Sequence, residues 1–130
     1  VPSLHLRGPM TRRQFQRLVA QALRRLPPRF RASLRNVAIV VEDWPGEEHL
    51  AEAGLEDRYD LLGLYLGIPL PDRHDYNMVL PDRILIFQKP IEAICRTDEE
   101  VVEQVRVTVL HEIAHYFGID DAELERLGLG

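Results

Sequence analysis

The stretch VLHEIAHYFGIDD, residues 109–121, decides which fold we expect for this chain. An α-helix has 3.6 residues per turn, so His111 and His115, four residues apart, leave one helix face about 40° from each other. Glu112 follows His111 directly. Gly118 suits the left-handed conformation that ends many helices, so we expect the chain to turn back there.

Two imidazoles in this arrangement can bind one metal ion through ring nitrogens at about 2.0–2.1 Å. Glu112 would stand beside the two histidines, where its carboxylate can accept a proton from a water that the metal activates. The HEIAH segment therefore indicates a metal site with a general base next to it.

Working outward from this helix, the sequence predicts an α+β layer fold. Apolar spacing and two capping boxes, at Thr11 with Gln14 and at Thr97 with Glu100, predict helices over about 11–26 and 97–118. Residues 36–42, 61–66 and 84–87 are predicted strands, the last closed by Lys89-Pro90, and residues 67–82 a long loop. The acidic stretch after Trp44-Pro45-Gly46 is left unassigned.

Length and composition bound the organisation of the chain. Its 130 residues, 45% apolar and 28% charged, predict one globular domain over residues 1–130. Residues 1–10 can alternatively form a disordered arm of this domain. The longest apolar run, residues 61–70, is too short to span a bilayer, and the first ten residues do not read as a secretory signal. Cys95 is the single cysteine. We therefore expect a cytoplasmic protein without membrane contact or an internal disulfide.

Three segments together resemble a known family: LLGLYLGIPL at 61–70, LPDRILIFQKPI at 80–91 and VLHEIAHYFGIDD at 109–121. The chain is similar, over roughly residues 36–130, to short bacterial zincin-like metallopeptidase domains. The pattern H-E-x-x-H-x-x-G-x-x-D also resembles the metzincin arrangement, with aspartate in place of the third histidine. This resemblance implies a minimal zincin-like fold with a sheet of three to four strands and a C-terminal active-site helix. It also implies one Zn²⁺ ion, bound by His111, His115 and Asp121, with Glu112 as the base.

The chain differs from metzincins because only nine residues follow Asp121 and none is methionine. With so short a tail we also do not expect a distant glutamate on a further helix to be a ligand. The third protein ligand is thus expected to be Asp121, with Asp120, Glu123 and Glu125 as alternatives. Two histidines and a carboxylate also occur in non-haem iron sites, but a neighbouring glutamate favours zinc, since an oxygenase needs no such base.

These features predict zinc-dependent hydrolysis of peptide bonds, with a peptide or protein substrate lying along an edge strand near 61–66 or 83–88. One alternative is a catalytically silent zincin-like binding module. Another is a metal-dependent endoribonuclease, since H-x-x-x-H-x-x-G-x-D also resembles bacterial ribosomal-RNA maturation endonucleases, which have glycine where Glu112 stands. The oligomeric state is left open, and a monomer is compatible with the sequence.

Charge is divided unevenly along the chain. Residues 1–41 hold nine arginines and no acidic residue, whereas the rest holds 7 basic and 21 acidic side chains. We expect a solvated basic helix face that offsets an acidic remainder, and no nucleic-acid partner, although such a face can also bind nucleic acid or anionic lipid.

Several other residues have two interpretations. Gln104 and Thr108 form a polar stripe that either supports the metal ligands or is a solvated helix face. Tyr65 either lines a cleft or belongs to the core. Three further side chains either line a cleft or lie on the loop surface, namely Arg73, His74 and Tyr76. His5, His49 and His74 are expected at the surface, and Cys95 is expected to be a small buried residue.

Overall fold

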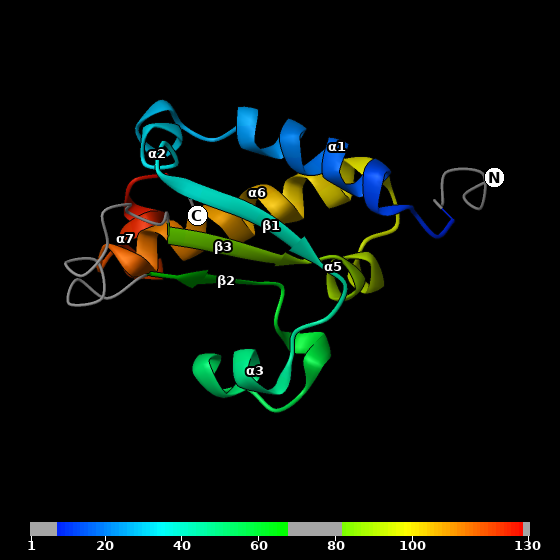
Figure 1. The fold of residues 1–130 in the computed structure, drawn as a ribbon. Coiled ribbons are helices and arrows are strands. Elements are labelled where there is room, and N and C mark those ends of the chain that lie inside the picture. The colour runs from blue at the N-terminus through cyan, green and yellow to red at the C-terminus, as the bar shows by residue number, and fades with distance from the viewer. Residues whose placement is uncertain (1–7, 68–81, 129–130) are drawn as a thin grey trace, which may run out of the picture.

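The computed structural model describes residues 8–67 and 82–128, which form a three-stranded sheet with helices around it (Figure 1). The elements in chain order are α1 (Arg12–Arg24), α2 (Pro28–Ala32), β1 (Val37–Glu42), α3 (Glu47–Ala53), η2 (Arg58–Asp60), β2 (Gly63–Leu66), β3 (Asp82–Phe87), α5 (Gln88–Ile94), α6 (Asp98–Tyr116) and α7 (Asp121–Arg126). The predicted α+β fold, with an N-terminal helix, a small sheet and the HEIAH segment on a long C-terminal helix, is confirmed. Most of the predicted loop, residues 68–81, lies outside the described residues. None of the described helices has the length and apolarity needed to cross a bilayer.

The sheet has the order β1–β3–β2, so the strand that comes last in sequence is the central one. β1 runs parallel to β3, and β2 runs antiparallel to it. A strand paired along both sides has no free edge to offer. The expectation that a substrate could lie along 83–88 is therefore wrong, whereas within the described residues β2 is paired on one side only.

α1 and α6 cover one face of the sheet, and Figure 1 shows α6 passing behind β1 and β3. α1 buries Phe15, Val19 and Ala22, as its apolar spacing predicts, and leaves its arginines exposed. Its capping box is confirmed, because Thr11 Oγ1 accepts a hydrogen bond from Gln14 N–H and Gln14 Oε1 accepts one from Thr11 N–H.

The start of α6 differs slightly from the prediction. Thr97 Oγ1 accepts a hydrogen bond from Glu100 N–H at 3.1 Å, as expected of an N-cap. The Glu100 carboxylate, however, accepts from Arg96 N–H instead of closing a reciprocal box on Thr97.

The end of α6 agrees with the prediction. Gly118 has φ +80°, its N–H donates to His115 O, and Ile119 N–H donates to Ala114 O. These two bonds make a Schellman motif, which satisfies the last carbonyls and reverses the chain. α7 begins soon after, so Asp121 returns toward the end of α6.

The start of the domain corrects the predicted arm. Met10 is only 8% exposed and belongs to the core. Its N–H donates to Glu92 Oε1, and its carbonyl accepts from Gln88 Nε2. Residue 10 is thus anchored on α5, and an arm extending to residue 10 is ruled out; residues 1–7 lie outside the described residues.

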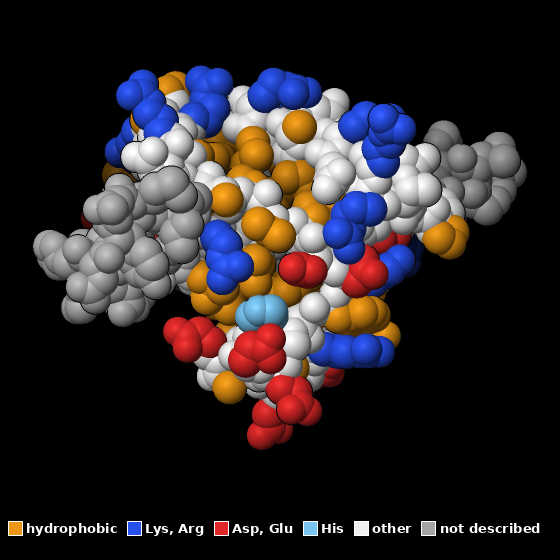
Figure 2. All heavy atoms as spheres, in the orientation of Figure 1, with side chains coloured by type: hydrophobic (Ala, Val, Ile, Leu, Met, Phe, Trp, Pro, Cys, Tyr) orange, Lys and Arg blue, Asp and Glu red, His pale blue; other side chains and the backbone are white. Residues whose placement is uncertain are grey.

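The acidic stretch that the sequence leaves unassigned contains α3 and η2. These elements cover part of the other sheet face, where Leu50 and Leu55 pack against a second apolar cluster that includes Leu64 and Phe87. Figure 2 shows basic side chains gathered over α1 and α2 at one end of the molecule and acidic side chains over α3 at the other. The uneven charge along the sequence is therefore also uneven in space.

Candidate functional site

The HEIAH segment lies in the last turns of α6 and lines a cavity of about 330 Å³. Helical spacing aligns one face of α6 along this cavity, namely Gln104, Val107, Thr108, His111, Glu112 and His115. The opposite wall comes from the segment between α3 and β2 and includes Leu55, Asp60 and Leu62. Two histidines and a glutamate thus line one cavity together with Gly63, the first residue of β2.

Glu112 is tied to β2 by its side chain. Its Oε1 accepts a hydrogen bond from the backbone N–H of Tyr65 at 2.9 Å. Burial raises the pKa of the Glu112 carboxyl above its usual value, while the bond from Tyr65 and the nearby His115 and His111 act in the opposite direction. The carboxylate is therefore both oriented and made more basic.

Asp121 lies beside both histidines. Its Oδ1 is 3.0 Å from His115 Nε2 and 3.8 Å from His111 Nδ1. The hydrogen bond with His115 is the main reason why the pKa of Asp121 lies below its usual value. The other ring nitrogen of His111, Nε2, is buried and has no hydrogen-bond partner within the described residues. A buried nitrogen without a partner has an unused capacity to bind a proton donor or a metal.

The donor types suit zinc, although the side chains are not arranged around an ion. Within residues 8–67 and 82–128, no group of three or more histidine, cysteine, aspartate or glutamate side chains could hold a metal ion as it stands. At this site His115 and Asp121 instead form a hydrogen bond with each other. Two imidazoles and one carboxylate remain a set that zinc accepts.

The alternative third ligands are less well placed. Asp120 is the N-cap of α7, and its Oδ1 accepts from Glu123 N–H at 2.8 Å. No described contact joins Glu123 or Glu125 to either histidine of the HEIAH segment. Asp121 is the one acidic residue of α7 with a described contact to them.

The remaining candidates divide between the site and the scaffold. Gln104 Nε2 donates to Thr108 Oγ1 at 3.3 Å, and both residues line the cavity. Tyr65 is half-buried and stacks on Tyr116 with ring centroids 4.0 Å apart. His49 is half-buried and caps α3 by accepting from Gly46 N–H, so its expected surface position is only partly correct. Cys95 is buried, as predicted. His5, Arg73, His74 and Tyr76 lie outside the described residues.

Two features of the site were not predicted from the sequence. The stack of Tyr65 and Tyr116 and the exposed ring of Phe117 border the end of α6. Leu55 and Asp60 reach the cavity from a stretch that carries no recognisable pattern. The sequence contains one sign of the aromatic border, namely the adjacent Tyr116 and Phe117 that follow the HEIAH segment.

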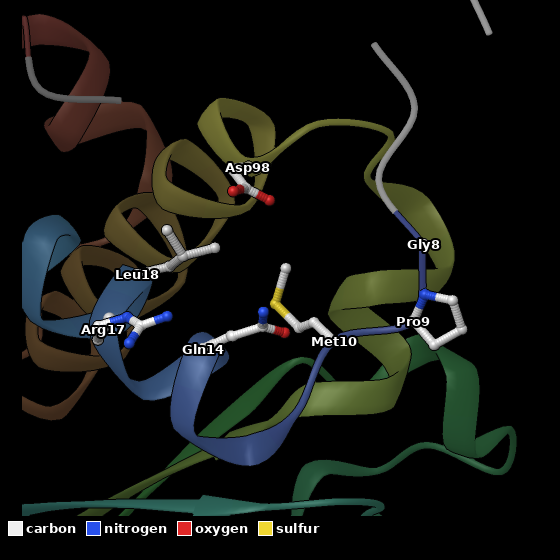
Figure 3. Close-up of a pocket in the computed structure, with 7 residues that line it drawn as sticks. All are labelled: Gly8, Pro9, Met10, Gln14, Arg17, Leu18 and Asp98. Atoms are coloured by element: carbon white, nitrogen blue, oxygen red, sulfur yellow. The ribbon is translucent and has the colours of Figure 1, made fainter. Parts of the chain in front are cut away.

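A second cavity, of about 300 Å³, lies at the other end of α6 (Figure 3). It is lined by residues 8–10, which precede α1, by Gln14, Arg17 and Leu18 of α1, and by Asp98, the first residue of α6. Asp98 and His111 are thirteen positions apart, which is about 20 Å along a helix. This second cavity is therefore separate from the HEIAH site.

The comparison with protein families agrees with this geometry. The family of zincin-like metallopeptidases matches residues 34–130. The chain belongs to the zincin-like metallopeptidase family. The match covers all three strands and α6, and it begins after α1 and α2, so the arginine-rich helices lie outside the part that defines this zincin-like chain. No curated protein matches the sequence.

Proposed function

We propose that this chain hydrolyses peptide bonds with one zinc ion and with Glu112 as general base. One observation carries the proposal: both histidines and the glutamate of the HEIAH segment line a single cavity, and the glutamate is oriented by the backbone of β2. Membership of the zincin-like metallopeptidase family supports the same reaction class.

His111, His115 and Asp121 would hold the zinc ion. Asp121 Oδ1 lies 3.0 Å from His115 Nε2 and 3.8 Å from His111 Nδ1, so the three side chains are neighbours. When bound, zinc would polarise the scissile carbonyl and lower the pKa of a water.

Glu112 would move the proton. Tyr65 N–H holds Oε1, which leaves Oε2 to accept a proton from the attacking water and to pass it to the leaving amine. Burial raises the pKa of this carboxyl, which brings it closer to the range in which a base works near neutral pH. The bond from Tyr65 also limits the rotamers of Glu112, so the proton transfer would start from an oriented base.

The substrate would be an extended peptide or protein segment beside β2. Within the described residues this strand has a free edge close to Glu112. An extended chain can add to such an edge through backbone hydrogen bonds. Tyr65 N–H is already used by Glu112, so the peptide would pair with the other edge groups of β2.

The second candidate is a zincin-like binding module without catalysis. The observation that favours it is the direct hydrogen bond between His115 and Asp121, which has to open before both can bind one ion. In that case His111, His115 and Asp121 would be a polar cluster at the end of α6. Metal content separates the two candidates.

Three measurements test the proposal: zinc content of the purified protein, hydrolysis of a mixed peptide pool, and hydrolysis of structured RNA. We expect one zinc per chain and cleavage of peptides only. Glu112→Gln should keep the zinc and lower hydrolysis by about 10²- to 10⁴-fold, because only the base is lost. Asp121→Ala should weaken zinc binding and hydrolysis together.

A protein that contains no zinc and fails to bind added Zn²⁺ would contradict the enzyme proposal. If Asp121→Ala binds zinc as tightly as the unchanged protein, the third ligand is wrong, and Asp120, Glu123 and Glu125 would be tested next. Cleavage of RNA alone would favour the endoribonuclease alternative.

A further inference from the structure

The cavity at the HEIAH site continues past the histidines along α6, toward Val107 and Gln104. At about 330 Å³ it lies at the lower end of the range for small-ligand pockets. Such a volume suits one long side chain with water, and it is too small for a folded segment. Because it adjoins Glu112, a side chain in it would belong to a residue close to the bond under attack.

The floor of this cavity is closed by a direct contact between β2 and α6. A Cβ atom added at Gly63 would lie only 2.6 Å from Thr108 Cγ2. The backbone of β2 therefore lies directly against the helix at this point. A side chain entering from the HEIAH side must lie between α6 and the segment before β2.

The walls and the rim differ in chemistry. Half-buried Leu55, Leu62 and Val107 supply apolar surface. At the rim Asp60 is exposed, and no described residue forms an ion pair with its carboxylate. Gln104 uses its Nε2 on Thr108, so its Oε1 remains available as an acceptor. The cavity thus combines an apolar passage with two oxygen acceptors.

The surrounding charge has the same sign as Asp60. Residues 42–60, which we call the acidic lobe, carry eight acidic side chains and one arginine. That arginine, Arg58, lies over the ring of Trp44 at 3.9 Å. The lobe therefore produces a negative potential at the side of the site that faces this cavity.

We propose that this cavity is a specificity subsite for a lysine or arginine side chain of the peptide substrate. The inference rests on the proposed function and adds the substrate class to it. The methylene stem of the basic side chain lies against Leu55, Leu62 and Val107, and its cation meets the Asp60 carboxylate and Gln104 Oε1. A neutral side chain of equal length fills the passage but leaves both acceptors to water.

The experiment compares quenched fluorescent peptides that differ at one position, which holds lysine, norleucine or glutamate. The position is moved stepwise along both sides of the cleaved bond. At one position we expect kcat/KM for lysine to exceed that for norleucine by about 5-fold at low salt, and the ratio to fall as salt rises, because Asp60 is exposed.

Two variants and one control assign the preference to Asp60. Asp60→Asn should bring the ratio of lysine to norleucine close to 1, and Asp60→Lys should favour glutamate at the same position. Glu56→Gln removes an equal charge from the same lobe at an exposed residue that does not line the cavity, so the ratio should fall much less than in Asp60→Asn. Unchanged melting temperatures would show that all three variants fold.

A binding measurement separates this inference from the proposed function. The zinc-loaded Glu112→Gln protein is titrated with labelled lysine and norleucine peptides, with and without Asp60→Asn. Lysine-dependent binding to this variant, with no cleavage by the zinc-loaded protein that retains Glu112, would support the subsite and contradict the hydrolase. Cleavage without a preference at any position would contradict the subsite and leave the hydrolase standing. The absence of both binding and cleavage would overturn both.

Discussion

At the scale of single residues, the proposed role of Glu112 as a base and the stability of the protein place opposite demands on this side chain. It is half-buried, and burial raises the pKa of its carboxyl. An ionised carboxylate that has lost part of its water costs free energy in the folded state, which the bond from Tyr65 N–H offsets only in part. A base kept ready for proton transfer is therefore expected to lower the stability of the protein that holds it.

We predict that Glu112→Gln stabilises the metal-free protein at neutral pH. The raised pKa means that the folded state holds a proton more tightly than the unfolded state, so stability is lost as pH rises above the ordinary carboxyl value of 4.5. Glutamine has no charge to bury, and its Oε1 can still accept from Tyr65 N–H. The melting temperature in EDTA should rise by a few degrees at pH 7 and match that of the unchanged protein below about pH 4.

Tyr65→Phe is the control for this measurement. It removes the hydroxyl that donates to Asp82 Oδ2 at 2.9 Å but keeps the backbone N–H that Glu112 uses. Because this variant keeps the Tyr65 N–H, the stabilisation by Glu112→Gln and its dependence on pH should persist in the Tyr65→Phe background. An equal or lower melting temperature for Glu112→Gln at pH 7 would show that the ionised Glu112 carboxylate does not destabilise the folded protein.

Residues of the site differ in how far the sequence predicts them. His111, Glu112 and His115 follow from helical periodicity alone, and Asp121 follows from the turn at Gly118, because both are local rules. Asp60 was not predicted, because it comes close to α6 only through the pairing of β2 with β3. A contact that depends on strand order leaves no periodic signal in the chain.

At the scale of elements, the end of α6 sets where Asp121 lies. The Schellman turn places Gly118 at φ +80°, and α7 starts immediately beyond Asp120. α3 ends in the same way, at Gly54 with φ +71°, far from any candidate ligand in sequence. The two glycines form a matched pair, since an added Cβ would meet nothing within 4 Å at either one.

We predict that Gly118→Ala and Gly54→Ala each lower the free energy of unfolding by about 1–2 kcal/mol, because alanine is strained at positive φ. Only Gly118→Ala should also weaken zinc binding, since it disturbs the turn that brings Asp121 to the histidines. Denaturant titration and zinc titration of both variants check this. An equal loss of zinc affinity in both would mean that the turn has no specific role.

The contact of β2 with α6 gives a third prediction. Gly63→Ala should destabilise the protein by about 1–3 kcal/mol, because its Cβ would lie 2.6 Å from Thr108 Cγ2 and 3.1 Å from the Leu85 carbonyl. Adding Thr108→Ser should recover part of the loss, since serine lacks the methyl group but keeps the hydroxyl that accepts from Gln104. Urea denaturation of the two single variants and the double variant measures this recovery. A purely additive double variant would contradict the steric explanation.

Helices and strands, like site residues, were predicted only where neighbouring positions in the sequence specify them. α1 and α6 have capping residues and several turns of apolar spacing, and both were predicted. The short helices α2, α3, α5 and α7, of five to seven residues, were missed. Helices this short are stabilised by packing and by their caps, so the spacing of apolar residues in the sequence does not predict them. The central position of β3 was also missed, because strand order is a property of the whole sheet.

At the scale of the whole molecule, the basic N-terminal part is joined to the acidic remainder by ion pairs. Arg12 binds Asp43 at 2.7 Å and also donates to the Val41 carbonyl, and Arg25 binds Glu99 on α6. These contacts lower the pKa of Asp43 and of Glu99 through hydrogen bonds from the two arginines. Part of the arginine face of α1 therefore serves the fold itself.

The last prediction concerns the arginines of α1 that have no such partner. Arg13, Arg17 and Arg24 are exposed, and no described residue forms an ion pair with them. A surface that binds RNA phosphates loses affinity linearly in log salt, with a slope set by the number of contacts. The chain carries a net charge of −5, and the one aromatic side chain of α1, Phe15, is buried and cannot stack on bases. We expect no measurable RNA binding at 0.15 M salt, either before or after the three are changed to glutamine. Binding that weakens steeply with salt, with a slope reduced by about 2–3 in the triple variant, would instead assign the arginine face to RNA and favour the nuclease alternative.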